Sequence, residues 1–182
     1  ADGMAELWFA DDAAMRNAAF RSPRDQADGL RRLFAGSAQR FVPLLSNPHV
    51  AFGGVLLERV TSALAALDRR VLLVDASERG GAPSDLAPVD LAACIETLGP
   101  RLGFLAARGL PLLHVDARGS THGFLQALGD AAPGVDVVLV HAPASDLARL
   151  FARHATHDGD APAPLLLADD RPASVTHAYA GM

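Results

Sequence analysis

The sequence predicts an α/β fold built on a doubly wound, mostly parallel sheet. Two observations lead to this prediction. Short, continuous runs of valine and leucine recur along the chain, and stretches with the spacing of amphipathic helices separate them. Strands buried on both faces have such continuous apolar runs, and the intervening helices cover the sheet. The 182 residues fit one domain of this kind, which buries roughly 70% of the surface of its unfolded chain.

The individual elements follow from the order of these runs. The apolar runs predicted as strands are Phe41–Leu45, Val71–Val74, Leu112–Val115, Val137–Val140 and Leu165–Leu167. The stretches predicted as helices are Val55–Leu67, Val89–Leu98, Phe124–Leu128, Leu147–His154 and Ala173–Met182. Glycine and proline mark turns at the joins, as in Gly80-Gly81-Ala82-Pro83. Two segments rich in glycine, proline, alanine and aspartate are predicted as loops, Ser77–Pro88 and His157–Pro164.

Residues 1–40 lie outside this alternation and are predicted as a helical segment that precedes an α/β domain over residues 41–182. Ser22 is suited to the N-cap of a helix, Pro23 to its first position and Asp25 to its third. One face of this helix carries apolar side chains at helical spacing: Ala27, Leu30, Leu33 and Phe34. The helix either packs on the sheet of its own domain, which physical chemistry alone favours, or binds in the groove of a partner protein.

Composition excludes several classes of protein. A net charge of −5 and a pI of 5.7 argue against a nucleic-acid-binding surface. No apolar run reaches the ~18 residues that a membrane span requires. Cys94 is the only cysteine, which excludes disulfide frameworks and cysteine-rich metal sites. The first residues lack the apolar stretch of a secretory signal. We therefore expect a cytoplasmic protein.

The turn after the first predicted strand lies where a phosphate-binding loop would lie. Strand, turn, helix and strand follow one another from Phe41 to Asp75, which is the frame of a P-loop. Such a loop needs glycines for close approach to phosphate, a lysine, and a serine or threonine for magnesium. The turn from Ser46 to Gly54 has no lysine, and Pro48 and Phe52 stand where small residues are needed. We expect Val50 or Phe52 to pack inward, and both to resist positive φ angles.

Three segments of the chain match motifs of a known family: Asp25–Arg31, Arg69–Ala76 and Asp170–Ala180. They resemble segments of the FlhG family, also called FleN or YlxH, whose members are ATPases of the MinD/ParA group. The N-terminal DQAxxLR motif of that family is matched by Asp25-Gln26-Ala27-Asp28-Gly29-Leu30-Arg31. Its GRRVLLVDAD strand is similar to Arg69–Ala76, and its PTSITDAYA segment to Asp170–Ala180. The likeness covers residues 22–182, and the DQAxxLR match is its most specific part.

This resemblance implies a fold and a partner. FlhG proteins have the MinD/ParA type of P-loop NTPase fold and control the number and placement of flagella. The resemblance therefore also implies peripheral attachment at the cell pole or membrane as an alternative within the cytoplasm. Their DQAxxLR motif precedes a deviant Walker A loop and activates FlhF, a GTPase of the signal-recognition type. By resemblance, the polar pair Asp25 and Gln26 would face the active site of such a GTPase, and Leu30 and Leu33 would anchor the helix. The residues implied in partner binding are Asp25, Gln26, Ala27, Leu30, Arg31 and Leu33.

The chain departs from the family at the nucleotide site. Against the family loop SGKGGVGKT, Ser46 matches the opening serine, but Pro48 stands at the signature lysine. Gly53 stands at the Walker lysine and Gly54 at the magnesium-binding threonine or serine. The nucleotide-binding loop is therefore predicted to be degenerate.

The two switch segments have changed as well. Asp75 is kept, but Ser77 replaces the next acidic position, and His141 replaces the carboxylate that opens switch II. Each loss removes a charge that neutralises triphosphate or holds its metal, an effect of several kcal/mol in the transition state. His49 and His141 are expected to approach one another, because both follow or end strands at the same edge of the sheet. No metal site is expected, because His154-Ala155-Thr156-His157-Asp158 lacks further ligands nearby.

These observations predict a pseudo-ATPase without catalytic residues and without ATP or magnesium as cofactor. By its resemblance to FlhG, it would regulate flagellar assembly or number through protein contacts with an FlhF-like GTPase or another flagellar assembly protein, and the ATP-driven dimer of the family would be missing. Two alternatives stay open. In the first, the chain would be a divergent MinD/ParA-type ATPase with residual nucleotide binding at Gly53-Gly54. In the second, it would be a ParA-like adaptor unrelated to flagella.

Overall fold

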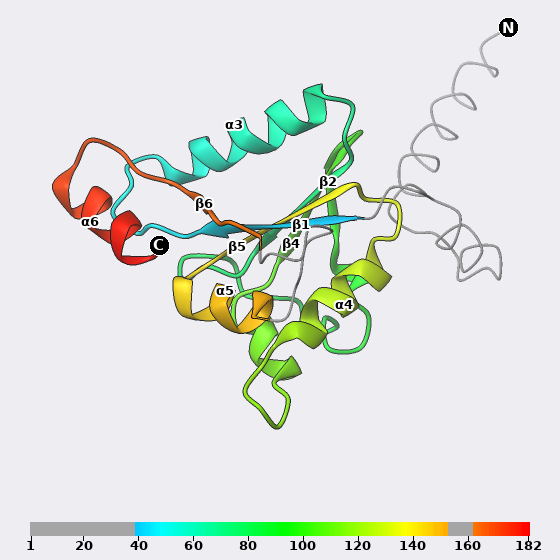
Figure 1. The fold of residues 1–182 in the computed structure, drawn as a ribbon. Coiled ribbons are helices and arrows are strands. Elements are labelled where there is room, and N and C mark those ends of the chain that lie inside the picture. Colours follow the sequence, from blue (N-terminus) through cyan, green and yellow to red (C-terminus); the bar gives the residue numbers. More distant parts are fainter. Residues whose placement is uncertain (1–38, 153–161) are drawn as a thin grey trace, which may run out of the picture.

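The computed structural model describes residues 39–152 and 162–182. They form an α/β fold, in which a mostly parallel sheet has helices on both faces (Figure 1). The order of the strands in the described sheet is β3-β4-β2-β5-β1-β6. Their bounds are β1 Arg40–Leu45, β2 Val71–Asp75, β3 Glu96–Gly99, β4 Leu102–Ala106, β5 Val137–Ala142 and β6 Leu165–Leu166. Neighbouring strands are parallel except for β3 and β4, which are antiparallel. The predicted fold class is confirmed.

Helix α3 (Gly53–Ala66) lies over one face of the sheet, and α4 (His122–Ala131) and α5 (Ala144–Phe151) lie over the other (Figure 1). Helix α6 (Pro172–Ala180) follows β6 at the end of the chain. Two short 3-10 helices, η1 (Ala92–Cys94) and η2 (Leu110–His114), belong to the connections. Within the described ranges, no helix has both the length and the apolar character that crossing a bilayer would require.

Helix α3 packs through a narrow apolar stripe and ends in a defined motif. Leu57, Val60 and Leu64 are partly buried against the sheet at helical spacing. The helix stops where Asp68 adopts a left-handed conformation with φ 59°. The amide of Asp68 donates to the carbonyl of Ala65, and the amide of Arg69 to that of Leu64. This is the bonding pattern of a Schellman motif, which satisfies the last carbonyls of a helix.

The main core lies between the sheet and helices α4 and α5. Phe124, Leu125 and Leu128 of α4 are fully buried, as is Leu150 of α5. They pack with alternate residues of the central strands, namely Leu72, Val74, Val138 and Val140. Because the central strands are buried on both faces, they carry the continuous apolar runs that made them recognisable in the sequence.

Strands β1, β2, β5 and β6 and helices α3 to α6 lie where the sequence predicted them, with shifts of a few residues at their ends. Helix α5 ends at Phe151, and Ala152 forms a turn. The last two residues of its predicted range, up to His154, lie outside the described residues. The predicted N-terminal helix lies in residues 1–38, outside the described residues.

The predicted strand Leu112–Val115 is wrong. This stretch lies mostly in the 3-10 helix η2, which begins after Gly109 with φ 78° and has Pro111 at its start. Proline has no N–H to donate to a strand ladder, which disfavours a central strand here. The strand of this region is β4, which pairs along its whole length with β2. Its sequence, Leu-Gly-Phe-Leu-Ala, has small residues at two positions and so gives a weak apolar signal.

The predicted helix Val89–Leu98 is also wrong. The chain forms the single 3-10 turn of η1 and then enters β3, which forms an antiparallel hairpin with β4. Pro100 and Arg101 form the turn between these strands. The apolar residues of Leu91–Ile95 had a helical spacing, but they are too few for a stable helix and end next to this strong turn signal.

Candidate functional site

A cavity of about 230 Å³ lies at the carboxyl ends of β1, β2 and β5, beside the start of α3. This edge of a doubly wound sheet is where such folds bind ligands. The structure brings together here the five residues that the sequence placed in a degenerate nucleotide site, Ser46, Pro48, Gly53, Gly54 and His141. The residues implied in partner binding, Asp25, Gln26, Ala27, Leu30, Arg31 and Leu33, lie outside the described residues.

Asp75 is the centre of a hydrogen-bond network on the wall of this cavity. Its Oδ1 accepts a hydrogen bond from the hydroxyl of Ser77 at 2.7 Å and from the amide of Ser77 at 3.1 Å. Nδ1 of His141 lies 3.0 Å from the same oxygen. Asp75 and His141 are direct partners in the parallel register of β2 and β5, so the sheet itself places their side chains together. The His141 side chain is 11% exposed and that of Asp75 is 18% exposed.

The network keeps the Asp75 carboxyl ionised. Burial by itself raises the pKa of Asp75, but the hydrogen bonds from His141 and Ser77 outweigh burial and hold its pKa below the usual 3.8. An ionised carboxylate only accepts hydrogen bonds, so Nδ1 of His141 is the donor in this pair. One carboxylate oxygen of Asp75 therefore already serves three donors from the chain itself.

The loop between β1 and α3 departs from the expectation at Phe52. Val50 packs inward and is 6% exposed, which confirms one of the two alternatives predicted for the loop. Phe52 points outward, is 81% exposed and has φ 59°. The expectation that Phe52 resists a positive φ is wrong. Its carbonyl accepts hydrogen bonds from the amides of Val55 and Leu56, which start α3 and offset a local cost of about 1–2 kcal/mol.

The two histidines singled out in the sequence have different neighbours. His141 is bonded to Asp75 inside the sheet edge. The exposed His49 lies against His177 of α6, with ring centroids 5.6 Å apart in an edge arrangement. The two histidines were expected to approach one another, but His141 contacts Asp75 of β2 and His49 contacts His177 of α6. His49 is held on the C-terminal segment, because its carbonyl also accepts a hydrogen bond from Arg171.

The start of this loop is bonded to the C-terminal segment of the chain. Nδ2 of Asn47 donates to the carbonyls of Leu167 and Ser174, each at 2.9 Å. Nε2 of His177 lies 3.1 Å from the carbonyl of Ser46, and since a carbonyl only accepts, this nitrogen is the donor. Sequence reasoning missed these contacts because they join positions more than a hundred residues apart.

The end of the loop is bonded to the same segment by a charged pair. The amide of Ala51 donates to Oδ2 of Asp169 at 2.8 Å. Arg171 forms an ion pair with this carboxylate at 2.9 Å and also donates to the carbonyl of His49. The hydrogen bonds from Ala51 and then from Arg171 hold the pKa of Asp169 well below its usual value. The acidic and basic residues of Asp169–Arg171, next to Pro172, were the only sequence signal for such a contact.

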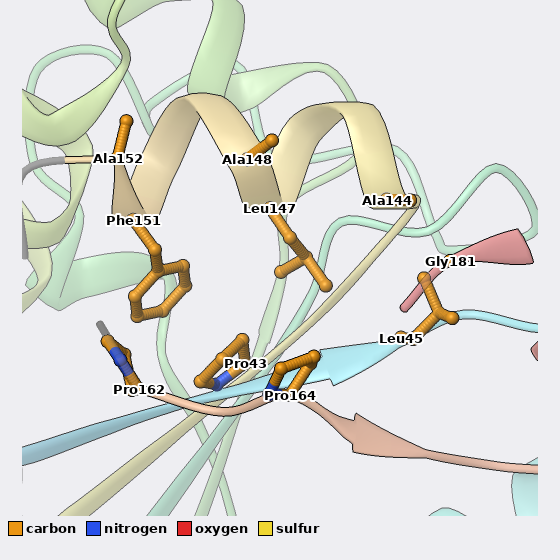
Figure 2. A pocket seen from close by; sticks show the side chains of 10 residues that line it. All are labelled: Pro43, Leu45, Ala144, Leu147, Ala148, Phe151, Ala152, Pro162, Pro164 and Gly181. Atoms are coloured by element: carbon orange, nitrogen blue, oxygen red, sulfur yellow. The ribbon is translucent and has the colours of Figure 1, made fainter. Parts of the chain in front are cut away.

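A second cavity, of about 240 Å³, lies between α5 and the strand β1 (Figure 2). Leu147 and Phe151 of the helix point toward Pro43, Leu45 and Pro164 across it (Figure 2). Its lining has no titratable side chain and includes none of the candidate residues. In the described part of the chain, no three metal-ligating side chains gather at a common point. The His154–Asp158 stretch lies outside that part. Of these two cavities in the described part of the chain, only the first is lined by titratable side chains.

The known proteins that this chain matches are solved structures. No protein-family model matches the chain, and no curated protein matches it. Among solved structures, the chain is similar to the kinase domain of the Escherichia coli tyrosine kinase ETK, with 17% sequence identity and a TM-score of 0.44. The similarity covers 73% of this chain and 62% of that chain, which is less than two thirds of its length. Functional conclusions therefore rest on the residues of the site itself.

Proposed function

We propose that this chain is a non-hydrolysing regulator of the FlhG type, on a P-loop NTPase fold of the MinD/ParA kind, that acts on flagellar assembly or number through protein contacts. The observation that carries the proposal is the Asp75–His141–Ser77 network. It occupies the place that, by resemblance, would hold the magnesium ion of a nucleotide. A carboxylate committed to three internal donors and a histidine in place of a second acid make a poor magnesium site, because magnesium prefers oxygen ligands.

The residues of the cavity do not fit a magnesium-bound triphosphate. The sequence contains no lysine at all, since its 16 basic residues are all arginine. No Walker lysine can therefore come from elsewhere in these 182 residues. Pro48 has no N–H to donate to phosphate, and the amide of Ala51 is already bonded to Asp169. These three features support the loss of ATP hydrolysis.

The DQAxxLR-like motif supports the partner. Where the nucleotide loop has lost its key residues, Asp25–Arg31 still matches the family motif at every defined position. A segment of this kind combines polar groups with an apolar anchor, which suits a helix that binds in the groove of another protein. An FlhF-like GTPase is the partner that the resemblance implies. A divergent ATPase would instead bind nucleotide, and an adaptor unrelated to flagella would leave such a GTPase unaffected.

Gln26→Ala is expected to lower the stimulation of an FlhF-like GTPase by at least about tenfold while leaving the affinity of the complex nearly unchanged. A polar contact at a reacting site acts mainly in the transition state, so its loss reduces the rate more than the binding. The measurement is GTP turnover and complex affinity with the full chain. Asp28→Ala is the matched control, because Asp28 stands at an undefined position of the same motif. Equal stimulation by wild type and Gln26→Ala, or none by wild type, would contradict the proposal.

A further inference from the structure

The C-terminal segment from Leu167 to His177, here called the strap, is hydrogen-bonded to four residues of the loop that runs from Ser46 to Phe52, namely Ser46, Asn47, His49 and Ala51. We propose that the strap is an internal ligand, which holds this loop in one conformation in place of a nucleotide. The inference deepens the proposed function and rests on it, because it identifies what fixes the degenerate loop when no nucleotide does so.

The first anchor of the strap is a buried polar cluster around Ser174. This residue is fully buried, and its carbonyl and hydroxyl both accept hydrogen bonds from Nδ2 of Asn47, at 2.9 and 3.2 Å. The Ser174 hydroxyl in turn accepts a hydrogen bond from the amide of Asp169 at 3.0 Å. The side-chain oxygen of Asn47 accepts from the amide of His49. One asparagine thus orders the turn of the loop and joins it to the strap at the same time.

The second anchor is the carboxylate of Asp169. Its Oδ2 accepts from the loop amide of Ala51 at 2.8 Å and from Nε of Arg171 at 3.0 Å. This amide lies immediately before Phe52, the N-cap of α3, at the end of the helix where negative groups are favoured. Arg171 also donates to the carbonyl of His49, so the loop is held through a donor and an acceptor of its own backbone.

The conformation of Phe52 shows why the loop needs such support. A phenylalanine at φ 59° that is 81% exposed gains little from packing, so its own side chain does not stabilise this strained backbone. Strained residues persist where surrounding contacts determine the backbone on both sides. On one side Ala51 is fixed by Asp169, and on the other α3 begins. The strap therefore supplies the contacts that hold the strained turn.

The strap determines when the loop can open. Because the contacts to the strap involve several backbone groups at once, the loop opens only when the strap detaches, as one cooperative unit. The surface that includes Phe52 is then present continuously and is not switched by nucleotide binding and hydrolysis.

Hydrogen–deuterium exchange of the full chain at neutral pH tests the strap directly. Asp169→Ala is expected to raise the exchange of amides in residues 47–54 about tenfold, because the acceptor of the Ala51 amide and the partner of Arg171 are both lost. Amides of β5 should keep their wild-type exchange and report that the domain stays folded. Asp170→Ala is the matched control, because Asp170 is exposed and makes no hydrogen bond or ion pair with the described residues. This control should exchange like wild type.

Arg171→Ala is a second variant that removes the contact to the His49 carbonyl and leaves the Asp169 carboxylate in place. It is expected to raise loop exchange as well, and it decides the question if Asp169→Ala does not fold. Unchanged loop exchange in a folded variant would overturn the role of the strap and leave the proposed function standing. Protection of the wild-type loop by added Mg-ATP would overturn the proposed function instead.

Discussion

Leu30→Asp is expected to abolish binding to an FlhF-like GTPase, with a loss of affinity of at least about a hundredfold, while the melting temperature of the chain stays unchanged. The substitution puts an unpaired charge into an apolar groove, and burying such a group costs several kcal/mol. Leu30→Met is the matched control, because it keeps an apolar side chain of similar volume and should retain binding. Complex affinity by calorimetry and thermal melts of the free chain measure both properties.

The same two measurements also test the alternative, in which the N-terminal helix packs on its own domain. If the N-terminal helix packs on its own domain, Leu30→Asp lowers the melting temperature and leaves stimulation of the GTPase unchanged. That result would contradict the proposal that the helix binds a partner, and it would favour the alternative in which its apolar face is part of the domain core.

Asp75→Ala is expected to destabilise the domain by about 2–3 kcal/mol at neutral pH, because the variant leaves the buried donors of His141 and Ser77 without their acceptor. Ser77→Ala removes one donor and keeps the carboxylate, so it should cost about 1 kcal/mol. Urea unfolding of both variants measures the difference in unfolding free energy. A loss for Asp75→Ala no larger than that for Ser77→Ala would show that the pair of Asp75 and His141 contributes little.

The same pair predicts the dependence of this effect on pH. The folded pKa of Asp75 lies below its usual 3.8, so its stabilising contribution is fully present above that value. It is lost as the pH falls through the lowered pKa, because protonation removes the charge that accepts the hydrogen bonds. The difference between wild type and Asp75→Ala should therefore be large at neutral pH and shrink in acid.

Much of the fold could be predicted because its central strands carry a strong local signal. The runs at Val71–Val74 and Val137–Val140 are buried on both faces, and such strands are continuous apolar stretches. Strand β4 was missed because Gly103 and Ala106 interrupt its apolar pattern. What makes it a strand is its pairing with β2, which only the tertiary structure supplies.

The candidate site, like the fold, could be predicted from the sequence only in part. The sequence placed Asp75 and His141 in the same degenerate nucleotide site, but it did not predict their hydrogen bond, which depends on the pairing of β2 with β5. The contact between Ala51 and Asp169 was not accessible, because it depends on where a short edge strand, β6, returns the chain. The backbone of Phe52 was misjudged for a related reason: intrinsic preference disfavours its φ angle, but neighbouring hydrogen bonds determine it.

Titration of the purified chain with Mg-ATP in a calorimeter tests the central claim, that this domain works without nucleotide, most directly. With no lysine in the sequence and with Asp75 bonded to His141 and Ser77, we expect no binding heat at millimolar nucleotide and no phosphate release above an enzyme-free control. Binding with micromolar affinity, or turnover above that control, would contradict the account, and turnover would establish the chain as a divergent ATPase.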